Sequence, residues 1–201
     1  MSSGSGHRRS QRSSPRRPIE KSQQGIELRL LRRTLDDLFE VAQRSILASR
    51  PVPSLVLVYT AIDILASLER GQESVGEAFR RWVARYLLAE LQTEATPADL
   101  WGARCGIVHT ASANSDLMNR GQARPIIYAG PFQGPDEVEE LARSLGHETD
   151  IVIGLGDLAT ATEIASGNYL SEIESHAERA RNATANAPYW LCSTGPPEAF
   201  Y

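Results

Sequence analysis

The chain has 201 residues, of which 41% are hydrophobic, and this is enough to bury the core of one domain of ordinary size. Two cysteines are too few for a disulfide framework or a structural zinc site, and no cluster of His, Cys, Asp or Glu has metal-ligand spacing, so we expect neither a metal nor a cofactor. We also expect a cytoplasmic protein that does not enter a membrane, because the sequence has no apolar run long enough to cross a bilayer and no secretory signal.

The charge is unevenly distributed along the chain. Residues 1–24 hold six basic side chains and one acidic side chain, whereas the rest has a net charge of −9. An acidic body argues against tight, sequence-blind nucleic-acid binding by the whole folded domain, although a local basic pocket is compatible with it. The Ser, Gly and Pro content of residues 1–24 predicts a disordered basic tail. Its role stays open between a phosphate-binding arm, a solvated leader and a remnant of cloning.

Four helices are predicted in the first half of the chain. Apolar residues recur at helical spacing over residues 26–50. Ser54 is expected to cap a second helix over 55–68, which is almost entirely apolar and should therefore be central. A third, amphipathic helix follows over 78–91. The fourth begins at Thr96-Pro97-Ala98-Asp99, which supplies an N-cap, a proline at the first helical position and an acid three residues after the cap.

The second half of the chain has a different pattern. Two short β-branched runs, Pro125 to Tyr128 and Ile151 to Ile153, are expected to pair as a small ribbon. Between them a short helix should run from Pro135 to Leu145, and a last helix should begin near Asp157. Residues 186–201 contain Pro, Gly and aromatics and are expected to be irregular.

These elements together predict a mainly α protein. The fold should be a helical bundle over residues 25–185 with a small β element near residues 125–154. The run from Ile151 to Ala159 imitates a dinucleotide-binding turn, with Gly154 and Gly156 after a strand. We set this interpretation aside, because the helix that follows is not succeeded by a second parallel strand.

The hexapeptide Arg104-Cys105-Gly106-Ile107-Val108-His109 on the fourth helix carries the main functional signal. At 100° per residue, His109 lies opposite the apolar face that Leu100 begins, on the outer side of the helix. Trp101 falls in the arc between Arg104 and His109 without an obvious internal partner. Gly102 and Gly106 cost the helix about 1 kcal/mol each relative to Ala and leave a strip of backbone bare.

A close partner surface would explain this face, and the simplest partner is a second copy of the chain. We therefore expect Trp101, Gly102 and Gly106 at a dimer interface, with Arg104 and His109 facing the seam. The alternative is a tolerated surface histidine and an arginine that only pairs with an acid.

Asp63 is a second candidate, because a carboxylate within a buried helix is costly unless it is paired. It is expected either to orient Arg104 or His109 or to make a structural bond to backbone or another arginine. Tyr59, one turn earlier, should share its face and belong to the core.

The helix from Asp99 to Thr110, with Arg and His separated by four residues, resembles the HEPN superfamily (higher eukaryotes and prokaryotes nucleotide-binding domains). The resemblance also draws on the run from Tyr59 to Leu65 and on Phe79 to Val83, and it covers roughly residues 26–115. It implies a homodimeric helical domain in which two Arg/His pairs line one cleft. In many members that cleft is the active site of a metal-independent endoribonuclease, which belongs to a toxin-antitoxin or antiviral defence system. The resemblance therefore implies that this chain cuts RNA and leaves a 2′,3′-cyclic phosphate. It also implies an antitoxin or a defence protein as a partner.

Two positions depart from the family pattern. Active members often have Asn, Asp or His after the motif Arg, whereas this chain has Cys105, whose thiol hydrogen-bonds weakly. Members that are modified by a partner nucleotidyltransferase have Tyr two residues after the motif His, and this chain has Ala111. Two alternatives to the ribonuclease therefore stay open, a non-catalytic HEPN-like module that binds a nucleotide or a protein and a purely structural helical dimer.

Overall fold

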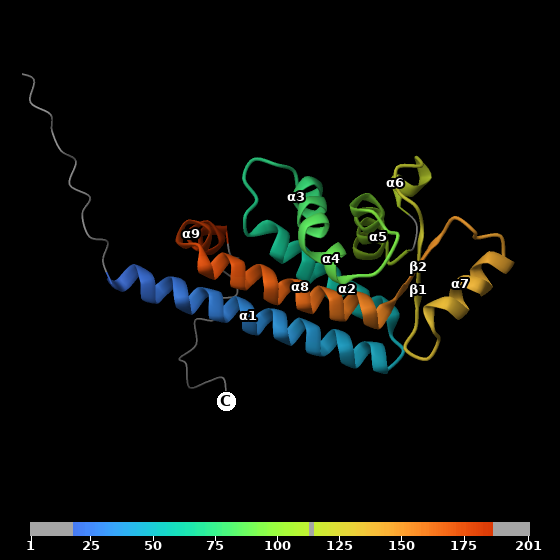
Figure 1. Cartoon of the computed structure of the whole chain (residues 1–201), viewed down its shortest axis with the longest axis horizontal. Coiled ribbons are helices and arrows are strands. Elements are labelled where there is room, and N and C mark those ends of the chain that lie inside the picture. Colours follow the sequence, from blue (N-terminus) through green and yellow to red (C-terminus); the bar gives the residue numbers. More distant parts are fainter. Residues whose placement is uncertain (1–17, 113–114, 187–201) are drawn as a thin grey trace, which may run out of the picture.

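The computed structural model describes residues 18–112 and 115–186, with side chains from residue 28 onward. It is mainly helical with one small two-stranded parallel sheet, which confirms the predicted fold class. Figure 1 shows α1 (Pro18–Leu47) and α8 (Leu155–Ser175) side by side along the length of the molecule. The sheet lies at one end of this pair and α9 (Ala177–Asn186) at the other.

The first helix, α1, buries the predicted apolar stripe, which includes Leu31, Leu35 and Ala42. It begins at Pro18, a residue suited to the first position of a helix, and so includes residues 18–24, which were expected to belong to the tail. The remainder of the expected tail lies outside the described residues.

Helix α2 (Pro51–Ser67) is buried on most sides and packs against α1, α3, α5 and α8, so its predicted central place is confirmed. Its start differs from the prediction, because Arg50 is the N-cap and Pro51 occupies the first turn. Ser54 does not cap the helix. Its hydroxyl lies inside the first turn and donates to the Arg50 carbonyl at 2.7 Å.

The third predicted helix is divided into α3 (Val75–Trp82), a π-helical turn η1 (Val83–Leu87) and α4 (Leu88–Glu90). It starts earlier than expected because Ser74 and Glu77 form a reciprocal capping box. The wide turn η1 places Tyr86 beside α8, where its hydroxyl donates to Glu172 Oε2 at 2.8 Å.

Helix α5 (Pro97–Thr110) begins at the capping box of Thr96 and Asp99, as the sequence predicts. Asp99 is 3% exposed and also accepts from the Arg124 backbone N–H at 2.6 Å and the Arg124 guanidinium at 3.0 Å. The carboxylate therefore fixes the start of α5 and the chain that leads into the sheet. The helix ends at Ala111, which has the left-handed φ of 50°, and the short α6 (Asp116–Asn119) follows.

The two predicted strands pair, as expected. Strands β1 (Ile126–Ala129) and β2 (Ile151–Gly154) are parallel, with Ile126 opposite Ile151, and α7 (Pro135–Ser144) connects them. A buried contact between the Tyr59 and Tyr128 hydroxyls joins β1 to α2. Tyr59 is fully buried, so its predicted place in the core is confirmed.

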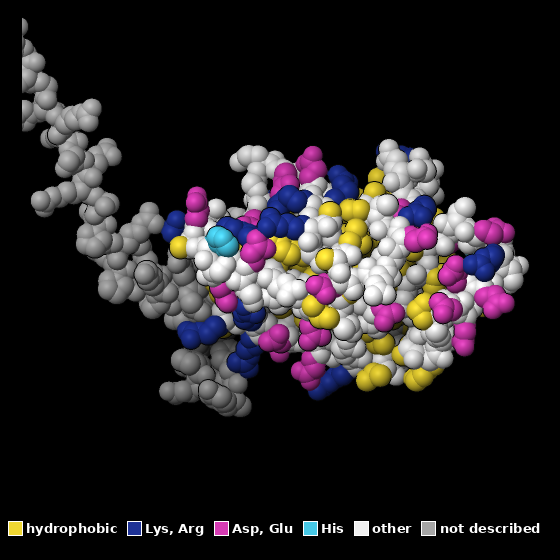
Figure 2. All heavy atoms as spheres, in the orientation of Figure 1, with side chains coloured by type: hydrophobic (Ala, Val, Ile, Leu, Met, Phe, Trp, Pro, Cys, Tyr) yellow, Lys and Arg dark blue, Asp and Glu magenta, His cyan; other side chains and the backbone are white. Residues whose placement is uncertain are grey.

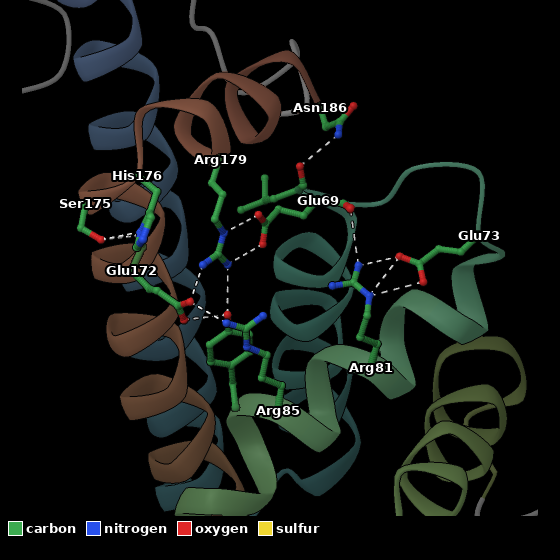
Figure 3. Close-up of polar contacts among 11 residues, drawn as sticks. Glu69, Glu73, Arg81, Arg85, Glu172, Ser175, His176, Arg179 and Asn186 are labelled. Atoms are coloured by element: carbon green, nitrogen blue, oxygen red, sulfur yellow. Dashed lines mark hydrogen bonds and ion pairs between the residues drawn. The ribbon is translucent and has the colours of Figure 1, made fainter.

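The last predicted helix is broken at His176 into α8 and α9. Figure 3 shows how α9 is fastened to the bundle, with Arg179 between Glu69 at the end of α2 and Glu172 on α8. Asn186 was expected to begin an irregular segment, but it is the last residue of α9, and the rest of that segment, from residue 187 on, lies outside the described residues. Within the part of the chain that the structure describes, no helix combines the length and the apolar character needed to span a membrane.

Candidate active site

The centre of the site is an ion pair between α2 and α5. Arg104 donates to Asp63 Oδ2 twice, from Nε at 3.0 Å and from Nη2 at 2.7 Å. The two side chains are 13% and 23% exposed, so the pair lies mostly out of water. Burial raises the pKa of the Asp63 carboxyl, and the adjacent guanidinium opposes that rise. Asp63 was expected either to orient Arg104 or His109 or to make a structural bond elsewhere. This geometry matches a carboxylate that orients Arg104.

The remaining terminal nitrogen of Arg104 contacts His109. Nη1 lies 2.9 Å from His109 Nε2, although the two residues are five positions apart on the helix. A guanidinium can only donate, so Nε2 accepts, and the neutral ring then carries its proton on Nδ1. His109 is exposed, as predicted. The arrangement thus presents an imidazole at the surface with an arginine beside its basic nitrogen.

Trp101 holds the guanidinium from a third direction. The Arg104 Cζ atom lies 5.1 Å from the centre of the Trp101 ring, within the range of a cation–π contact. The ring also packs against Phe79 on α3, with ring centroids 5.2 Å apart. Trp101 therefore has partners within its own chain, and the expectation that it lacks one is wrong.

Gly102 is also explained within the chain. A Cβ atom at Gly102 would lie 2.7 Å from the Cβ of Ala123, because the segment before β1 crosses the helix there. Gly102 and Gly106 are both buried. The expectation of a bare strip of backbone is therefore wrong, and the placement of Trp101, Gly102 and Gly106 at a dimer interface loses its original reason.

Cys105 follows the motif arginine and is partly buried. Burial raises the pKa of its thiol, while the charge of Arg104 acts in the opposite direction. The group is thus a protonated thiol at neutral pH, a weak hydrogen-bonding partner.

A second cation, Arg80, was not predicted. It lies on α3, which packs against α5, and its charge acts to lower the pKa of the Cys105 thiol. Its side chain has no hydrogen bond or ion pair within residues 28–112 and 115–186. Arg80 belongs to the run from Phe79 to Val83 on which the resemblance draws, and that run was the signal in the sequence that could have found it.

An open hollow of about 380 Å³ adjoins His109. Its polar wall comes from Cys105, His109 and Thr110 of α5 and from Ser115, Asp116 and Asn119 at α6. The last three residues were not predicted, because α6 is only four residues long and leaves no periodic signal in the sequence.

The charges of the molecule are separated over its surface. Figure 2 shows basic side chains gathered over α3, and acidic side chains at the end where α7 lies. The carboxylates of α7, including Asp136, Glu137 and Glu140, are exposed. An anionic ligand would therefore meet less repulsion at α3 and α5 than at α7.

Comparison with protein-family models, with curated proteins and with solved structures finds no match. The function of the chain must therefore be argued from the site itself.

Proposed function

We propose that the chain is a HEPN-like, metal-independent endoribonuclease in which Arg104 and His109 form the working pair. The observation that supports this most strongly is the chain of contacts from Asp63 through Arg104 to His109, at the edge of an open hollow. An isolated arginine and a surface histidine would not need a partly buried carboxylate to fix their positions. A role in a toxin-antitoxin or antiviral system belongs to the same proposal, since the resemblance implies it.

The chemistry follows from the atoms present. A phosphodiester oxygen takes the place of His109 at Arg104 Nη1, and the guanidinium stabilises the charge that builds on phosphorus. The released Nε2 then accepts the proton of a ribose 2′-hydroxyl. The 2′-oxygen bonds to phosphorus, the bond to the 5′-oxygen breaks, and that oxygen takes up a proton. The product is a 2′,3′-cyclic phosphate.

RNA is the substrate in this scheme, because the attacking hydroxyl belongs to the ribose and DNA lacks it. The resting pair supplies a base and no acid, since Nε2 is unprotonated when it accepts from Arg104. In a dimer, the His109 of the second copy, in its protonated form, would donate a proton to the leaving oxygen and become neutral. The proposal therefore includes a homodimer, and light scattering should give about twice the 22.0 kDa mass of the chain.

The decisive experiment incubates the purified protein with labelled RNA in the presence of EDTA. His109→Ala should reduce the cleavage rate by roughly 10²- to 10⁴-fold, the usual contribution of a general base. His147→Ala is the matched control, because His147 is also exposed and lies outside the site, paired with Asp150. Cleavage that requires a divalent metal, or that persists in His109→Ala, would refute the proposal.

A second candidate is a HEPN-like module that binds a nucleotide or a protein without cutting RNA. It is favoured by Cys105, whose raised thiol pKa leaves a poor hydrogen-bonding group after the motif arginine. The same experiment separates the candidates. Absence of cleavage across several RNAs, together with an Arg104-dependent affinity for nucleotides, would favour the binding module.

A further inference from the structure

We propose that the hollow beside His109 binds the guanine base of the nucleotide whose 2′-hydroxyl attacks, so that RNA is cut on the 3′ side of guanosine. This inference rests on the ribonuclease function proposed above and names the base that the site selects. It concerns residues at α6 that lie outside the Arg/His motif.

The size and place of the hollow fit one nucleoside. Its volume of about 380 Å³ falls within the range of about 300–1,000 Å³ that is typical of small-ligand pockets. His109 lies in the wall of the hollow. When the 2′-hydroxyl of a nucleotide is bound at His109 Nε2, the base of that nucleotide points either into the hollow or out to solvent. Leu117 contributes an apolar surface to the wall, and a base face can pack against it.

Asp116 and Asn119 supply the polar groups that would read the base. They are three positions apart on α6 and therefore share a face. Both are exposed, and neither side chain has a hydrogen bond or ion pair to another described residue. Two unused polar side chains thus border one space beside the candidate catalytic histidine.

The chemistry of these groups selects guanine. An ionised carboxylate only accepts hydrogen bonds, and its two oxygens match two parallel N–H donors. Guanine is the one RNA base whose Watson–Crick edge carries two adjacent donors, at N1 and N2. The Asn119 amide can then donate to guanine O6, which adenine lacks. The other bases present at most one donor group to Asp116.

Ser115 belongs to the buried edge of the wall. The residue is 8% exposed, and its hydroxyl lies on the side of Gly102 of α5. The hollow is also polarised, since Asp116 borders it on α6 and His109, held by Arg104, borders it on α5. A guanosine 3′-phosphate has matching groups, with donors on the base and an anion at the phosphate.

The test measures binding of the four nucleoside 3′-monophosphates to the wild-type protein, by calorimetry, because these ligands have no phosphodiester to cleave. We expect the guanosine nucleotide to bind at least tenfold more tightly than the other three, about the discrimination of one good bidentate contact. Asp116→Asn should abolish this preference. Asp136→Asn is the matched control, since it is the same change in the first turn of another helix and should leave the preference intact. Equal affinities for all four nucleotides, or a preference that survives Asp116→Asn, would overturn the inference.

Cleavage assays separate this inference from the function on which it rests. Wild-type protein that selects the guanosine nucleotide but cuts no RNA would refute the ribonuclease and retain the base site. Cleavage after all four bases at equal rates, unchanged by Asp116→Asn, would refute the base site and retain the ribonuclease. Cleavage after guanosine that becomes indiscriminate in Asp116→Asn is the result that supports both.

Discussion

Asp63 and Arg104 are 41 positions apart in the chain, and they meet on one carboxylate oxygen, Oδ2, which accepts from both Nε and Nη2 of the guanidinium. This contact uses one edge of the arginine and leaves Nη1 directed at His109. The Asp63 carboxylate thus fixes the direction in which Arg104 Nη1 points, and it makes no hydrogen bond to His109 itself.

Asp63→Ala should therefore impair cleavage through the position of Arg104. We expect the cleavage rate to fall by roughly 10²-fold, since small misplacements of a catalytic group cost about that much. The free energy of unfolding should fall by about 1–3 kcal/mol, because a half-buried guanidinium loses its partner. Rate measurements and urea unfolding check the two effects. Asp37→Ala, at an exposed position of α1, is the control and should change neither. Undiminished cleavage by a folded Asp63→Ala protein would contradict the positioning role.

Gly102→Ala should destabilise the protein although alanine is the better helix former. The added Cβ would lie 2.7 Å from the Cβ of Ala123, so the segment before β1 must shift. We expect the free energy of unfolding to fall by about 1–3 kcal/mol, as is usual for overpacking. Gly167→Ala in α8 is the matched control, because beyond its chain neighbours and the local backbone of its own helix no atom lies within 4 Å of the new Cβ there. That change should raise the free energy of unfolding by about 0.5–1 kcal/mol, and a stabilising Gly102→Ala would contradict the packing described.

Acid should weaken the fold through Asp99. Burial alone would raise the pKa of this carboxyl, but hydrogen bonds from Arg124 and Thr96 outweigh it and lower the pKa below its usual value. A group with a lowered pKa stabilises the fold above its unfolded pKa, near 3.9, and loses that contribution as the pH falls through its folded value. Urea unfolding between pH 6 and pH 2.5 should show this loss.

The substitution Asp99→Asn isolates the Asp99 contribution. It should lower the free energy of unfolding at pH 7 by about 1–2 kcal/mol, the size of a lost cap, and flatten the decline below pH 4. Asp36→Asn, at an exposed site on α1, should leave the wild-type profile intact. An unchanged acid decline in Asp99→Asn would mean that other carboxylates are responsible.

Arg179 should control the attachment of α9. Its guanidinium donates to both carboxylate oxygens of Glu69, to Glu172 and, at 3.1 Å, to the Tyr86 hydroxyl (Figure 3). Arg179→Ala should speed amide hydrogen exchange throughout α9 and lower the free energy of unfolding by about 1–3 kcal/mol. Arg181→Ala serves as the control, because the Arg181 side chain has no ion pair among the described residues. Equal exchange in the two variants would show that apolar contacts, and not this network, hold α9.

The helices were predictable where their ends and buried faces are set by residues close together in the sequence. The capping box of Thr96 and Asp99 and the apolar stripe of α1 depend on residues within a few positions of one another, so the sequence reveals them. The start of α2 was missed because Pro51 and Ser54 both suit a helix start, and sequence alone does not rank them. The break at His176 was missed because the apolar spacing continues into α9.

The candidate site divides in the same way. Asp63 was identified from the cost of a carboxylate within a buried helix, and Arg104 and His109 were identified from their spacing and from the resemblance to the HEPN superfamily. The surroundings of Gly102 and Trp101 were predicted wrongly, because their partners Ala123 and Phe79 belong to other segments of the chain. A helical projection of α5 does not show which other segments pack against it. Periodicity describes one helix, whereas these contacts depend on how helices and loops meet.

The contact between Tyr59 and Tyr128 gives the small sheet a mechanical link to the site. Tyr59 stands one helical turn before Asp63 on α2, and Tyr128 belongs to β1. Burial raises the pKa of both phenols, so the link is uncharged at neutral pH. The small sheet and the candidate site thus meet on one stretch of α2, which contacts β1 through Tyr59 and Arg104 through Asp63.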